Sequence, residues 1–138
     1  MSQTNYRHLE SSVQSGVLVI TVTENQLQDE KLAQAIQDEL LSVVNSAGLS
    51  SVVVDLRNIR YVSSVAFRPL LRLRRHVHDA GGKLVLCGMS RIVGDVFFTT
   101  KLVSPDGSFV APFEMAADAA AAVERITSPS PKKSVKTD

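Results

Sequence analysis

The sequence of 138 residues holds one cysteine, Cys87, no tryptophan and only 5% aromatic residues. A single cysteine cannot form a disulfide within the chain, and its place in an apolar strand pattern indicates a buried, unreactive thiol. Neither sign of charge dominates, since 15 lysines and arginines nearly balance 14 aspartates and glutamates. The formal net charge of +1 gives the chain no general attraction for nucleic acid or for an anionic membrane surface.

Long apolar runs are also missing. No stretch approaches the roughly 18–20 residues that a membrane span needs, and the first residues lack the basic and apolar segments of a secretory signal. We therefore expect a cytoplasmic protein without a membrane span. The length fits one domain, over residues 1–126, and the Ser, Pro and Lys composition that follows predicts a disordered tail over 127–138.

The motifs of common catalytic sites are absent. The sequence contains no GxxxxGK[ST] loop, no GxGxxG loop and no Gly-x-Ser-x-Gly elbow. Among its three histidines, His76 and His78 are two residues apart and cannot share a helix face, and no cysteine cluster accompanies them. We predict no enzymatic activity, no catalytic residue, no metal site and no cofactor.

Apolar spacing predicts alternating strands and helices. Strands are expected over 6–13, 17–23, 52–56, 83–87 and 108–111. Four helices are expected. The first follows an apolar pattern from Leu27 to Val44 and ends at Gly48, and the second begins after Ser63-Ser64. The third covers 91–99 with Ser90 as N-cap, and the fourth runs from Pro112 to 126. In the third of these, Phe97 and Phe98 should face opposite ways. The order β-β-α-β-α-β-α-β-α predicts an α/β fold, with a mixed sheet of parallel core strands and helices packed against it.

The stretch from Ser51 to Leu73 organises the rest of the chain. An apolar strand ends at Asp55, a polar turn follows, residues 61–62 return towards the core, and Ser63-Ser64 precede a helical pattern. Ser64 has two interpretations: an N-cap whose oxygen accepts a helix amide, or an exposed hydroxyl where a phosphate would meet the positive end of a helix. Pro69 does not fit a regular helix that begins at Ser64, so we expect a loosened first turn.

The segment VVVDLRNIRYVSSVAFRPLL resembles the central motif of the STAS domain, the family of bacterial anti-sigma factor antagonists. In that family an apolar strand ends in Asp-Leu, and Asp-Ser-Ser-Gly or Ser-Ser-Ala-Gly opens a helix. The resemblance covers roughly Tyr6 to Ile126 and implies that Ser64 is the phosphoacceptor. Ser63 stands in place of the acidic residue often found before it, Val65 in place of a small residue and Ala66 in place of the glycine.

The resemblance also implies a partner, an anti-sigma factor that acts as a serine kinase, and a homodimer is a further possibility that it leaves open. The loop that follows the second strand should lie at the same end of the sheet as Ser64 and share in docking. The residues predicted to contact the partner are Ser63, Val65, Arg68, Glu24, Asn25, Gln26, Asn58 and Ser90.

Asp55 is predicted to accept hydrogen bonds from loop amides and so to fix the turn that leads to Ser63. A competing interpretation makes Asp55 the phosphoacceptor of a response-regulator receiver. That chemistry needs clustered acidic groups for magnesium, and the sequence offers only Glu24 near a strand end.

Two hypotheses for the function remain open. In the first, the chain is a switch whose docking surface is altered by phosphorylation of Ser64. In the second, it is a constitutive STAS scaffold, a subunit of a sensory or transporter assembly that uses the same surface without phosphorylation. The missing acidic residue before Ser64 and the position of Pro69 favour the second.

Overall fold

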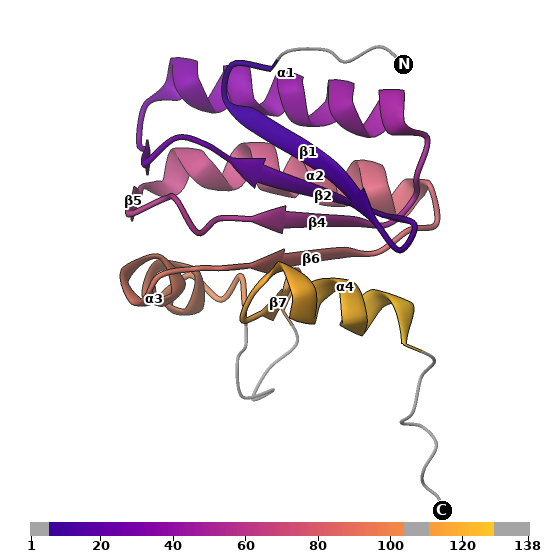
Figure 1. Ribbon diagram of the computed structural model, residues 1–138. Coiled ribbons are helices and arrows are strands. Elements are labelled where there is room, and N and C mark those ends of the chain that lie inside the picture. Colours follow the sequence, from indigo (N-terminus) through magenta and orange to yellow (C-terminus); the bar gives the residue numbers. More distant parts are fainter. Residues whose placement is uncertain (1–5, 104–110, 129–138) are drawn as a thin grey trace, which may run out of the picture.

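The fold is seen in a computed structural model that describes residues 6–103 and 111–128. In this part of the chain the main sheet has five strands, in the spatial order β1-β2-β4-β6-β7 (Figure 1). β1 is antiparallel to β2, and all other neighbours are parallel, which confirms the predicted mixed sheet. The strands are β1 (Leu9–Gln14), β2 (Val17–Val22), β4 (Val52–Asp55), β6 (Leu84–Cys87) and β7 (Glu114–Ala116).

Helices cover both faces of the central strands. α1 (Glu30–Ala47), α2 (Phe67–Asp79) and α3 (Arg91–Thr99) pack on one face, and α4 (Ala119–Thr127) packs on the other. Val54 of β4 belongs to the core beneath the first three helices, whereas Val53 belongs to the core beneath α4. Both side chains are fully buried. This is why the central strands are nearly continuous apolar runs without polar alternation.

Local signals set the ends of several elements. Ser15 and Gly16 have φ angles of 53° and 79°, as a two-residue hairpin turn requires. α1 ends at Gly48, whose left-handed φ of 68° closes the helix as predicted. Its start differs from the prediction, because the Asp29 side chain accepts a hydrogen bond from the Leu32 amide at 2.9 Å and caps a helix that begins at Glu30.

A second, two-stranded sheet was not predicted. Leu27, expected in the first helix, lies instead in β3 (Gln26–Leu27), which pairs in parallel with β5 (Tyr61–Val62). Each strand is only two residues long, too short to show an alternating pattern in the sequence.

The C-terminal part also differs from the prediction. Pro112 does not begin a helix, because the chain first adds β7 to the edge of β6, and α4 begins only at Ala119. The Asp118 side chain caps α4 by accepting the Ala121 amide at 2.8 Å. The strand expected over 108–111 falls mostly outside the described residues, as does the tail predicted from 127, although Thr127 itself is the last residue of α4.

Within the described ranges, 6–103 and 111–128, no helix combines the length and apolar character needed to cross a bilayer.

Candidate functional site

Ser64 begins a short 3-10 helix, η1 (Ser64–Ala66), that leads directly into α2. Ser63, with extended φ and ψ of −125° and −179°, is the residue before η1, and its side chain makes no capping hydrogen bond. The Ser64 side chain is exposed, and its hydroxyl makes no hydrogen bond to any residue that the structure describes. Ser64 is therefore not an N-cap, and its hydroxyl is presented to solvent.

The helix behind Ser64 is firmly anchored. Ala66 is fully buried, Pro69 and Leu70 are buried at the start of α2, and Val65 is half-buried. Pro69 is the third residue of α2, a position whose amide has no partner within the helix, so the proline costs no helical hydrogen bond. The 3-10 turn that precedes α2 is the loosened first turn that this proline required.

The pairing of β3 with β5 brings the loop over 24–26 beside the serine segment. The Arg60 amide donates to the Asn25 carbonyl at 2.8 Å, and the Ser63 amide donates to the Leu27 carbonyl at 3.1 Å. These two hydrogen bonds flank β5 and hold both segments at one end of the sheet (left in Figure 1).

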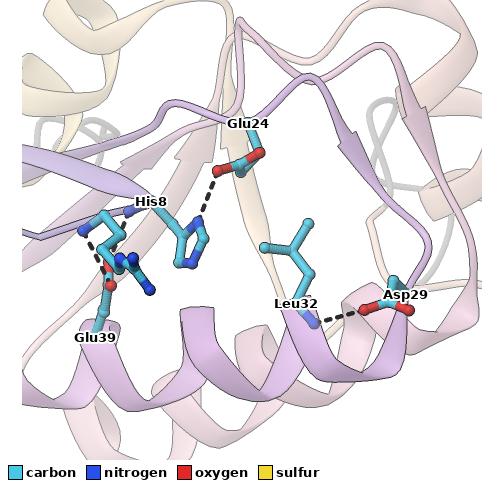
Figure 2. A network of polar contacts seen from close by, with 6 residues as sticks. His8, Glu24, Asp29, Leu32 and Glu39 are labelled. Carbon is cyan, nitrogen blue, oxygen red and sulfur yellow. Dashed lines mark hydrogen bonds and ion pairs between the residues drawn. The ribbon is translucent and has the colours of Figure 1, made fainter.

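Glu24 is held by a polar network that the sequence did not suggest (Figure 2). Its carboxylate lies 2.6 Å from Nδ1 of His8, just before β1. The Glu39 carboxylate of α1 accepts the backbone amides of Arg7 and His8, at 3.1 and 2.9 Å. The loop that starts at Glu24 is thus tied to both β1 and α1. No local pattern in the sequence indicates this role of His8, because its partners lie 16 and 31 residues away.

Three other predicted contact residues have structural partners. The Asn58 side-chain amide donates to the Val22 carbonyl at 3.0 Å, and the Ser90 hydroxyl caps α3 by accepting the Val93 amide at 3.2 Å. Arg68 forms an exposed ion pair with Glu30 of α1 at 3.5 Å. An exposed pair of this kind contributes little to stability, so Arg68 is available to exchange partners.

Asp55 lies at the carboxyl end of β4 with only 3% of its surface exposed. Its Oδ1 accepts the Arg57 amide at 3.0 Å, and its Oδ2 lies 3.7 Å from the Arg57 Nε. These contacts fix the turn that leaves β4 towards β5. A carboxylate buried and engaged in this way is inaccessible to a phosphodonor, which argues against the receiver interpretation.

Cys87, the neighbour of Asp55 across the β4–β6 pair, is fully buried. Burial, together with the carboxylates of Asp55 and Asp118, raises the pKa of its thiol to about 12. The thiol is therefore protonated and unreactive at neutral pH. In the part of the chain that the structure describes, no cluster of three or more His, Cys, Asp or Glu side chains could hold a metal ion.

Two apolar side chains are exposed near this end of the sheet. Tyr61 of β5 is 52% exposed, so it points outward and not back towards the core as expected, and Ile92 of α3 is 58% exposed. α3 lies against β5. Phe97 is fully buried and Phe98 is 43% exposed, which confirms that the two phenylalanines face opposite ways. Exposed aromatic and aliphatic side chains that gather on one part of a surface are typical of a protein-docking site.

Comparison with known proteins gives the family. The sequence profile of the STAS domain matches residues 8–106. No curated protein sequence matches the chain.

Solved structures agree with the profile. An anti-sigma-factor antagonist (STAS) domain protein from Planctomyces limnophilus is 19% identical, with a TM-score of 0.69 over 86% of this chain and 97% of that one. The anti-sigma factor antagonist SpoIIAA in its unphosphorylated form is 15% identical, with a TM-score of 0.61 over 88% and 99%. The murine anion transporter Slc26a9 is 14% identical, with a TM-score of 0.61 over 83% of this chain but 18% of the transporter. At these identities the likeness is one of fold. With the profile matching most of its length and the fold shared with these structures, the chain belongs to the STAS domain family.

Proposed function

We propose that this protein is a non-enzymatic interaction switch, an anti-sigma factor antagonist that docks on a serine kinase and is phosphorylated by it on Ser64. The observation that carries the proposal is the exposed Ser64 hydroxyl, which has no hydrogen-bond partner among the described residues and opens a rigidly anchored helix. A kinase needs a hydroxyl that it can reach, and Ser64 offers one without any unfolding.

The docking surface consists of four parts at one end of the sheet: η1, the loop over 24–26, Tyr61 of β5 and Ile92 of α3. Backbone hydrogen bonds hold the loop beside the serine segment, and the His8–Glu24 contact holds its first residue. Because this surface is fixed by the fold, binding a partner costs little ordering entropy. Exposed apolar side chains supply contact area, and the polar loop supplies hydrogen bonds.

Phosphorylation would change this surface without refolding the protein. A phosphoserine carries about −1.5 to −2 charges at pH 7. Amides at the start of η1 and α2 offset part of that charge. Arg68, four residues after Ser64, lies close to the same helix face and is held only by an exposed pair with Glu30. The rest of the charge faces the partner, whose surface was shaped for a hydroxyl, so binding weakens through repulsion and desolvation.

The test is a phosphorylation assay with the cognate kinase and ATP, in which the modified residue is located by mass spectrometry. We expect phosphate on Ser64, no phosphate in Ser64→Ala, and phosphate still located on Ser64 in the matched control Ser63→Ala. Phosphate on Ser63 alone, or phosphorylation that persists in Ser64→Ala, would overturn the assignment.

A second function is favoured by two observations. Ser63 stands where an acidic residue is common in the family, and Slc26a9, a transporter, contains a domain of this fold. A constitutive scaffold would use the same surface without phosphorylation. Incubation with ATP separates the two functions: the switch gains phosphate on Ser64 and releases its partner, whereas a scaffold keeps its partner under the same conditions and gains no phosphate.

A further inference from the structure

The outer edge of β1 is open. β1 is the terminal strand of the sheet, and among the described residues no strand pairs with its outer side. The His8 carbonyl, just before β1, accepts a hydrogen bond from the Thr23 amide. The backbone amides and carbonyls of the even-numbered residues of β1 therefore face β2. In an antiparallel ladder the alternate residues then point their amides and carbonyls outward. These residues are Leu9, Ser11 and Val13.

This edge lacks most of the features that normally prevent strand addition, since Glu10 is its one charged residue. Its six residues pair with β2 without a bulge, and they include no proline and no lysine. Residues 10–14 are all exposed. α4 packs chiefly on β2, β4, β6 and β7, and the hydrogen bonds to α1 come from residues 6–8, before β1. Val13 is 59% exposed, more than any other large apolar side chain among the described residues. The opposite edge strand, β7, has only three residues, half the length of β1.

We propose that β1 is a homodimerisation edge, at which a second copy of this chain adds its own β1 in antiparallel orientation. The observation that selects a second copy is the self-complementarity of the strand. With a two-fold axis through Ser11, Ser11 faces Ser11 of the second copy in a hydrogen-bonded pair. Leu9 then faces Val13 in a second such pair, which covers the exposed valine. Glu10 is the one charged residue of β1 and faces Ser12, so no like charges meet.

The geometry of such a dimer has a consequence for docking. An antiparallel pair of edge strands joins the two sheets into one continuous sheet and reverses the direction of the second copy. β5 and η1 lie at one end of the sheet and the β1–β2 turn lies at the other (Figure 1). The two Ser64 surfaces would therefore point in opposite directions, both uncovered, and the dimer would be bivalent for its partner. This inference does not depend on the function of Ser64.

The test is sedimentation velocity of the purified protein over a concentration series. A six-residue strand pair buries less than the roughly 1,600 Å² of a standard interface, so we expect a weak dimer with a Kd on the order of 1–100 μM. Ser11→Lys and Ser11→Glu each place like charges face to face across the axis and should raise the Kd about two- to fivefold. An equimolar mixture of the two variants should restore the dimer.

Ser46→Lys is the matched control, since it adds the same charge at an exposed position on α1 and should leave the Kd unchanged. Hydrogen exchange gives a second readout that does not depend on mutation: the amides of residues 9, 11 and 13 should become protected as concentration rises. A wild-type chain that stays monomeric, a dimer that Ser11→Lys does not weaken, or a mixture that fails to dimerise would each overturn the proposal.

Discussion

Replacing Gly88 by alanine tests whether the buried contact of Asp55 organises the turn towards Ser64. Gly88 follows β6 with a left-handed φ of +74°, and a Cβ there would overlap the Asp55 Oδ1 and lie 3.1 Å from the Arg57 amide nitrogen. These two atoms form the hydrogen bond that fixes the turn after β4. The added methyl group would therefore displace the Asp55 carboxylate from the Arg57 amide.

The expected destabilisation has two parts. Holding an alanine in the left-handed region costs about 1–2 kcal/mol. Displacing the carboxylate from its partner leaves a buried acceptor unsatisfied, which costs about 1–3 kcal/mol. Gly88→Ala should therefore lower the free energy of unfolding by roughly 2–5 kcal/mol, measured by urea denaturation followed by circular dichroism.

Gly81→Ala is the matched control. Gly81 has a φ of +79°, but nothing lies within 4 Å of a Cβ placed there, so only the backbone cost of about 1–2 kcal/mol should appear. In an Asp55→Ala background, the additional cost of Gly88→Ala should fall to the same range. Equal losses of stability in Gly88→Ala and Gly81→Ala would refute the role assigned to the Asp55–Arg57 contact.

Three further predictions concern the core, the buried thiol and a helix cap. Phe97→Ala should lower the free energy of unfolding by about 3–5 kcal/mol, because removal of the fully buried ring leaves a cavity. Phe98→Ala should lower it much less, and similar losses in the two variants would contradict the burial of Phe97 and the exposure of Phe98. Because its pKa is raised to about 12 from 9.0, Cys87 keeps its proton in the folded state while the unfolded chain loses it, so stability should fall as pH rises from 9 to 12. Thermal melts across that range should show a shallower fall in Cys87→Ala, and an unchanged slope would contradict the shift. Asp29→Ala should cost about 1 kcal/mol in thermal unfolding, because the Leu32 amide loses its cap, and Asp29→Asn, which retains a capping oxygen, should cost clearly less; equal losses would count against the cap.

Many features of the fold were predictable because their causes lie within a few residues of one another. The run Val52–Val54 is β-branched and uninterrupted, which indicates a strand buried on both faces, and it is one. Gly48 ends α1 and Ser90 begins α3 through contacts that span three or four residues. Signals of this kind can be recognised from the sequence alone.

The candidate site was only partly predictable. The motif around Ser64 indicated its position, but whether the hydroxyl capped a helix or faced solvent depended on how the chain entered α2. That entry is set by the pairing of β3 with β5 and by the hydrogen bond between Ser63 and Leu27, which are 36 residues apart in the sequence. The role of His8 was hidden for the same reason.

The sequence by itself determined the STAS motif and the order of the long helices and main-sheet strands, but not β3 and β5. Caps, turn residues and apolar periodicity act over one or two helical turns, so they can be recognised without the fold. Tertiary structure alone decided that Ser64 and Tyr61 are exposed, that Glu24 is held beside the serine segment, and that β1 has an open edge. Each of these depends on which distant strand or helix covers a residue, and that is fixed only when the whole sheet assembles.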